Sequence, residues 1–199
     1  KEGAKISNLT GLEHSINLTE LHIVDSQISD VSPLATLPSL TRLDLQYNQL
    51  TDLSGLADAN LPNLTRLDLH NNQISDITVV SNLTSLTELF LNRNQLTDLS
   101  ELSNLTKLTS LSLHNNQITD ITTLLENTGI SGTINFKNNP LNNTALSTHV
   151  PILKARGIIV GYDEVPADII KISNSNFEAS LRKALNIPTE TITVSNTTT

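Results

Sequence analysis

The chain contains no cysteine, methionine or tryptophan, and only 5 of its 199 residues are tyrosine or phenylalanine. Without cysteine it forms no disulfide, no thiolate metal site and no thiol nucleophile. It has no run of about 18 apolar residues, so the sequence predicts no membrane-spanning helix. Lys and Arg number 12 against 20 Asp and Glu, and the basic residues do not cluster. This acidic balance argues against binding to nucleic acid or to anionic membrane surfaces.

Three residue types dominate the chain: 34 Leu, 25 Thr and 23 Asn make up 41% of it. Such a skew predicts an internal repeat. The tetrad Gln-[Ile/Leu]-[Ser/Thr]-Asp occurs five times, with steps of 22, 24, 22 and 22 between its Asp residues. The five Asp residues are Asp30, Asp52, Asp76, Asp98 and Asp120. The phrase Leu-x-[Leu/Ile]-x-x-[Asn/Ser] precedes each tetrad, and residues 134–139 form a sixth copy without it.

The repeat predicts the fold. Leu-x-Leu alternates with period two, so each copy is a short strand with both Leu facing inward, and stacked copies pair about 4.8 Å apart in a parallel sheet. Apolar residues at spacing three, such as Leu34, Leu37 and Leu40, predict 3₁₀-like turns. We therefore expect an α/β fold: a leucine-rich-repeat solenoid, coiled right-handed, with the sheet on the concave face and short 3₁₀ or helical turns on the convex face. Two extra residues near positions 57–60 predict a convex bulge.

Two polar columns in the repeat have structural interpretations. The Asn residues at the strand exits predict buried amides that satisfy unpaired backbone groups. They are Asn48, Asn72, Asn94, Asn116 and Asn139. The Asp column suggests calcium, but a carboxylate at the start of a turn also accepts backbone N–H groups as an N-cap. Five like charges about 5 Å apart each need their own donors, so we favour capping.

Sequence patterns for chemistry are weak. His70 and His114 share an outward column but lie two repeats apart, about 10 Å by strand spacing. That separation is too large for a shared metal ion. No serine has both a base and an orienting acid nearby, which argues against nucleophilic catalysis. We therefore expect no catalytic residue, no metal site and no cofactor.

The concave face carries the candidate binding residues, because packing does not fix its outward positions. Tyr47 and Phe90 fall there with no role in the core, and Arg66 and Arg93 flank Phe90 in the predicted register. Aromatic and arginine side chains dominate the energetics of interfaces, although a lone exposed Phe needs no explanation. The predicted ligand-binding residues are Phe90, Tyr47, Arg66, Arg93, Asp68, His70 and Asn92.

The repeats resemble the 22-residue repeats of bacterial internalin-like surface proteins. The shared phrases are Asn-Gln-Ile-Ser-Asp-Ile and Asn-Leu-Thr-x-Leu-x-Leu, over roughly residues 9–141. The resemblance implies a secreted or surface-displayed bacterial protein that binds a protein partner with the inner face of its curve. Neither an internalin-type cap before residue 9 nor an immunoglobulin-like pattern after the repeats is visible, so host-cell invasion is not implied. A glycan-binding module and a structural spacer in a tandem surface array are the alternatives.

The sequence predicts three parts. Residues 1–141 form the solenoid, with about six repeats and a truncated N-terminal cap. Residues 142–162 form a C-terminal lid, in which Pro151 starts a second short helix and residues 158–160 form an edge strand. Residues 163–199 resemble a linker and the start of the next module's cap, as if cut from a tandem array. There Phe177, Leu181 and Leu185 recur at spacing four, an apolar helical face for head-to-tail self-association or for folding back on the lid.

Overall fold

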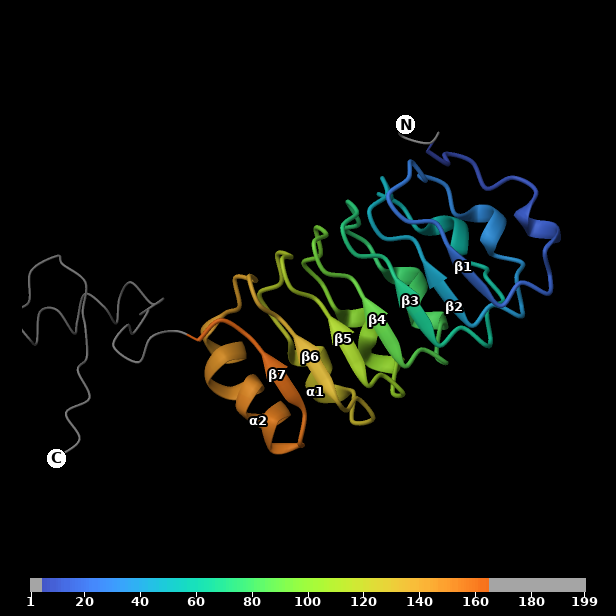
Figure 1. Cartoon of the computed structure of the whole chain (residues 1–199). Coiled ribbons are helices and arrows are strands. Elements are labelled where there is room, and N and C mark those ends of the chain that lie inside the picture. The colour runs from blue at the N-terminus through green and yellow to red at the C-terminus, as the bar shows by residue number, and fades with distance from the viewer. Residues whose placement is uncertain (1–4, 165–199) are drawn as a thin grey trace, which may run out of the picture. The chain divides into compact units, whose positions relative to one another are not determined.

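The computed structural model describes residues 5–164, and within them seven short strands form a single sheet. The strands follow chain order, and every neighbouring pair is parallel (Figure 1). They are β1 (Glu20–His22), β2 (Arg42–Asp44), β3 (Arg66–Asp68), β4 (Glu88–Phe90), β5 (Ser110–Ser112), β6 (Thr133–Asn135) and β7 (Ile159–Gly161). This arrangement confirms the predicted α/β leucine-rich-repeat solenoid with its parallel sheet.

Short helical turns lie behind the sheet; the first precedes β1, and the others connect successive strands (Figure 1). They are η1 (Leu12–His14), η2 (Ser32–Leu34), η3 (Ser54–Leu56), η4 (Thr78–Asn82), η5 (Ser100–Asn104) and α1 (Thr122–Glu126). The first five are 3₁₀ turns, as the leucine spacing of three predicts. In η2, for example, the Leu34 N–H donates to the Val31 carbonyl at 2.9 Å. The 24-residue step from β2 to β3 is taken up by largely exposed residues from Ala57 to Asn60.

Leucine and isoleucine side chains from all repeats form one continuous core between the sheet and the turns. The inward strand residues Leu43, Leu67 and Leu89 have no exposed surface. Burying one such side chain stabilises the fold by about 1.5–3 kcal/mol. A single repeat cannot achieve this burial, because only its neighbours cover its two sides. Accordingly Leu18 and Leu21, in the first repeat, are only partly buried.

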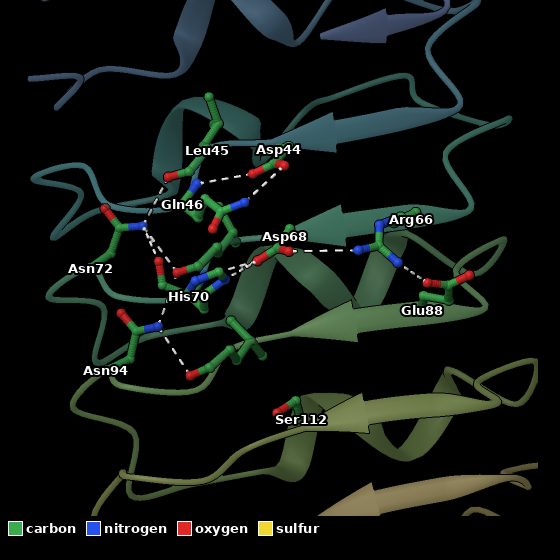
Figure 2. A network of polar contacts seen from close by, with 12 residues as sticks. Asp44, Leu45, Gln46, Arg66, Asp68, His70, Asn72, Glu88, Asn94 and Ser112 are labelled. Carbon is green, nitrogen blue, oxygen red and sulfur yellow. Dashed lines mark hydrogen bonds and ion pairs between the residues drawn. The ribbon is translucent and has the colours of Figure 1, made fainter. Parts of the chain in front are cut away.

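The asparagine column joins each repeat to the one before it, as predicted. Asn72 Oδ1 accepts the Leu50 N–H at 3.1 Å, and its Nδ2 donates to the carbonyls of Leu45 and Leu69, both at 3.0 Å. Leu69 belongs to the same repeat, and the other two partners belong to the preceding one. Figure 2 shows Asn72 together with its counterpart Asn94. Equivalent bonds are made by Asn48, Asn94, Asn116 and Asn139.

A threonine ladder at the strand entrances was not foreseen from the sequence. The Thr41 hydroxyl donates to the Thr19 carbonyl of the preceding repeat at 2.9 Å. The same bond recurs at Thr65, Thr87 and Thr109. Gly132 ends the ladder with a φ of 72°, and a Cβ there would lie 2.0 Å from the Thr109 carbonyl oxygen. Only glycine fits this close approach.

The aspartate column holds the start of each turn through hydrogen bonds. Asp98 accepts the Ser100 N–H at 2.9 Å and the Ser100 hydroxyl at 2.7 Å. These bonds, the hydroxyl first, lower the pKa of Asp98. The backbone bond recurs at Asp30, Asp52, Asp76 and Asp120. The capping prediction is confirmed with one correction: Asp98 stands one residue before the N-cap position, which Leu99 occupies.

One helical segment follows the last repeat. It comprises the π-helical turn η6 (Ala145–His149) and the helix α2 (Val150–Ala155), and α2 begins one residue before Pro151, without a break. The wide π turn precedes a proline whose ring would clash with the carbonyl four residues earlier in a regular α-helix. Gly157, with a φ of 84°, leads out of the helix. Strand β7 then pairs with β6 at the edge of the sheet.

The predicted linker and partial cap of residues 163–199 lie outside the described residues, apart from Asp163 and Glu164. The proposed self-association face of Phe177, Leu181 and Leu185 is among the residues not described. The division of the chain into three parts and the head-to-tail contact therefore stay predictions.

We predict that Asn72→Ala lowers the free energy of unfolding by about 1–3 kcal/mol, because it leaves the buried Leu50 N–H without an acceptor. The Leu45 and Leu69 carbonyls each lose one of two donors and keep the bond from Asn48 or Asn94. Chemical denaturation followed by circular dichroism measures this loss. Asn104→Ala, at an exposed position in η5, is the control and should change stability by less than about 0.5 kcal/mol. Equal effects of the two substitutions would contradict the structural role of the asparagine column.

We predict that Asp98→Asn costs stability at pH 7 and costs progressively less as the pH falls below about 4. Because the pKa of Asp98 is lowered in the folded state, its contribution is present above the unfolded pKa of about 3.9 and is lost as pH falls through the folded value. Asn is the matched replacement, since Asn8 in the equivalent position accepts the Thr10 N–H at 2.7 Å. Thermal unfolding across pH measures the difference.

The same melts, run with calcium and with a chelator, separate capping from metal binding. Capping predicts identical melting temperatures for the parent chain in both solutions. A lower melting temperature in the chelator alone would establish a calcium ladder instead.

Candidate ligand-binding face

The open face of the sheet consists of the outward side chains of the strands and of the two or three residues that follow each strand. From β1 to β4 this face is rich in charged and aromatic residues. The outward side chains of β5 and β6 themselves are small and uncharged: Ser110, Ser112, Thr133 and Asn135. Of the residues that follow these two strands, only His114 and Lys137 are ionisable. The candidate site therefore lies on the N-terminal half of the face.

Arg66 on β3 lies at the centre of the N-terminal half of the face and contacts three of its side chains. One guanidinium nitrogen forms an ion pair with Glu88 on β4, and the other lies 3.8 Å from Asp68 (Figure 2). The guanidinium carbon also lies 4.4 Å from the centre of the Phe90 ring. A stacked and ion-paired arginine is held in one orientation, and it holds the aromatic ring in place as well.

Asp68 continues the network toward β2. Its Oδ1 lies 2.7 Å from His70 Nδ1 and also accepts the His70 N–H at 3.3 Å. An ionised carboxylate only accepts hydrogen bonds, so Nδ1 carries the proton. The His70 ring in turn meets the Tyr47 ring edge-on, with 5.0 Å between ring centres. Five of the seven predicted residues thus form one connected cluster across three strands.

The predicted residues differ in how far a ligand can reach them. Tyr47 is 45% exposed, and Arg93 is exposed as well. Asp68 and Asn92 are only 5% and 8% exposed, so a ligand would reach little of either side chain, and their role in binding stays a prediction. Asp68 is occupied by Arg66 and His70 and positions them. The structure offers no hydrogen-bonding explanation for the burial of the Asn92 side chain.

Tyr47 and Arg93 occupy backbone positions that suit other residues better. Six non-glycine residues at the strand exits have φ between 49° and 57°. They are Asp25, Tyr47, Asn71, Arg93, Asn115 and Asn138. Asn and Asp tolerate this left-handed conformation, whereas other side chains pay about 1 kcal/mol. The exposed Tyr47 and Arg93 are therefore retained against a local conformational cost, a pattern typical of functional positions.

One polar pair on the face was missed from the sequence. The Ser112 hydroxyl lies 2.9 Å from His114 Nδ1, a contact that a Ser-x-His spacing on a strand could have suggested. Burial lowers the pKa of His114, with smaller contributions from Arg93 and His70. Among residues 5–164, no carboxylate lies within hydrogen-bond distance of His114, and no three His, Asp or Glu side chains are arranged to hold a metal ion.

Comparison with known proteins identifies the relatives of this chain. The family model described as "Leucine Rich repeats (2 copies)" matches residues 16–58, 38–83 and 84–126. An internalin (inlF) from Listeria monocytogenes is 30% identical, with a TM-score of 0.71, over 80% of this chain and 47% of that one. Internalin C2 of the same species is 28% identical, with a TM-score of 0.58, over 80% of this chain and 77% of that one.

A leucine-rich-repeat protein of Leptospira interrogans shares the fold at 24% identity, with a TM-score of 0.50, over 67% of this chain and 41% of that one. No curated protein sequence matches the chain significantly. The chain spans about half the length of the first internalin, since it covers 47% of that protein. Two of these neighbours are thus internalins, the bacterial proteins that the repeat phrases resemble.

We predict that Arg93→Asn raises the free energy of unfolding by about 0.5–1 kcal/mol, because Asn removes the left-handed backbone strain. The reciprocal substitution Asn71→Arg, at the equivalent position one repeat earlier, should lower it by a similar amount. Thermal melts of both variants test the pair. If Arg93→Asn destabilises the fold, the arginine side chain contributes to stability and the strain argument is wrong.

Proposed function

The chain belongs to the leucine-rich-repeat family, and we propose that it is a non-enzymatic protein-binding module that holds its partner on the concave face of the sheet. The observation that carries this proposal is the connected cluster of Tyr47, His70, Asp68, Arg66 and Phe90. Aromatic and arginine side chains, held in place beforehand, are the usual source of binding energy in protein interfaces.

The cluster is preorganised for binding in two ways. The ion pairs and ring contacts of Arg66 and His70 fix side chains that a partner would otherwise have to order at about 0.5–1.5 kcal/mol each. The left-handed backbone at Tyr47 and Arg93 directs two exposed side chains outward at the exits of β2 and β4. A face that served only as solvated surface would have no use for either feature.

We propose further that the module belongs to a bacterial protein that is secreted or displayed on the cell surface. The likeness to two Listeria internalins supports this location. Among the described residues, no helix has the length and apolar character needed to cross a membrane.

Experiment can distinguish the proposed protein-binding function from two alternative functions. A glycan ligand would use the polar groups of Asp68 and His70 beside the Tyr47 or Phe90 ring. A structural spacer in a tandem array would use none of them. The buried and engaged state of Asp68 favours a protein partner, since little of its carboxylate is left for sugar hydroxyls.

We predict that the double variant Tyr47→Ala/Phe90→Ala loses capture of the partner, by about 1 kcal/mol or more for each residue that is a hot spot. Its stability should change by no more than about 1 kcal/mol, because neither ring belongs to the core. The measurement is a pull-down from extracts of host-cell and neighbouring-cell surfaces, followed by titration of the purified captured protein.

Ile152→Ala provides the matched control, because it removes apolar surface that is 38% exposed but lies in α2. It should leave capture unchanged. Capture that survives enzymatic deglycosylation of the extract supports a protein ligand over a glycan. A parent chain that captures nothing beyond what the double variant captures would establish the spacer.

A further inference from the structure

The carboxylates of the open face are all engaged by donors of the chain itself. Asp68 and Glu88 contact Arg66. On the preceding strands, Asp44 accepts from the Gln46 side chain at 3.0 Å and lies 3.5 Å from His22 Nδ1. Glu20 and Asp25 complete the set, the first 3.4 Å from His22 Nε2 and the second 2.8 Å from Lys5. From β1 to β6, no acidic side chain of the face is left without a donor.

The cations of the face are not matched in the same way. Within residues 5–164, Arg42, Arg93 and Lys137 form no ion pair and no side-chain hydrogen bond, whereas Arg66 has two acidic partners. Glu20 lies opposite Arg42 in the strand register, but its carboxylate contacts His22 instead. Arg42 pairs with Arg66 of the cluster in the strand register, and Arg93 follows Phe90 by three residues.

We propose that the partner is a protein segment that places one acidic side chain on Arg42 and another on Arg93, with an apolar side chain between them against Tyr47 and Phe90. This inference rests on the proposed binding function of the face and specifies its chemistry. A charged group in an interface needs a partner of opposite sign, and here only positive groups are unmatched. The chain as a whole carries a net charge of −8, so the preference is local to this cluster.

The geometry sets the spacing of the two acidic residues. Arg42 lies at the start of β2, and Arg93 lies five positions beyond Glu88, the residue that corresponds to Arg42 on β4. Five residues along the strands and two strand spacings across give a separation of roughly 15–20 Å. An extended segment covers this distance in about five or six residues. The partner segment is therefore expected to read acid, apolar centre, acid over that length.

The test uses the immobilised full chain and a display library of random peptides long enough to span both arginines. Selected peptides should be rich in Asp and Glu at the predicted spacing. A synthetic peptide of the leading sequence should bind more weakly in high salt, because salt screens exposed charge pairs. Replacing its acidic residues by Asn and Gln should weaken binding about tenfold.

Variants of the chain identify the arginines involved. Arg42→Gln and Arg93→Gln should each weaken the peptide about three- to tenfold, and Lys107→Gln, an exposed charge outside the sheet face, should not. Arg93→Asn, which relieves backbone strain, shows the same loss without a folding defect. Repeating the selection on Arg42→Glu/Arg93→Glu should yield basic peptides in place of acidic ones.

The outcomes separate this inference from the function on which it rests. Peptides that depend on Tyr47 and Phe90 but carry no excess of acidic residues would overturn the acidic-partner inference and leave the binding face standing. Failure to select any peptide that depends on these two rings would overturn both.

Discussion

Each buried asparagine at a strand exit joins two repeats, and the rest of the structure depends on this contact. The Asn72 amide accepts the Leu50 N–H and donates to the Leu45 and Leu69 carbonyls, which Asn48 and Asn94 also contact, so successive amides share their acceptors. Leaving such groups unpaired in a leucine core costs about 1–3 kcal/mol each. Because the amide contacts the preceding repeat, its hydrogen bonds form only where two repeats are stacked, and the same stacking buries their leucine side chains. The same contact fixes the register that places Arg42, Arg66 and Glu88 side by side.

A fixed register leaves the outward positions free, and these are where repeats of one fold differ. The inward residues barely vary, since the leucine of each strand meets the leucine of the next. Outward, the column that begins with Glu20 changes from charged residues on β1–β4 to Ser110 and Thr133 on β5 and β6. Charge, aromaticity and backbone strain therefore coincide on the same few strands, although packing imposes none of them.

The fold could be predicted from the sequence because its causes are periodic. The strands, the 3₁₀ turns, the asparagine amides and the capping aspartates all recur with the repeat, so each copy confirms the others. What was missed depends on the orientation of side chains and not on their spacing. Asp68 and its register partner Asp44 are both only 5% exposed although they are polar. The Ser112–His114 contact depends on one rotamer. The threonine ladder is also periodic. The sequence shows the recurring threonine, but it does not show that the hydroxyl donates to a backbone carbonyl of the preceding repeat.

The division of charges on the open face explains why an acidic chain can select an acidic partner. Eight excess negative charges repel such a partner at long range, but this repulsion is screened within about 8–10 Å at physiological salt. At contact, the interaction energy depends on the nearest charged groups of the face. Its carboxylates already contact His22, Gln46, Arg66 and His70. A partner carboxylate therefore meets Arg42 and Arg93, the latter held in a strained conformation. The apolar side chain between the two charges then distinguishes this partner from other acidic molecules, because it contacts Tyr47 and Phe90 and adds affinity that charge alone does not supply.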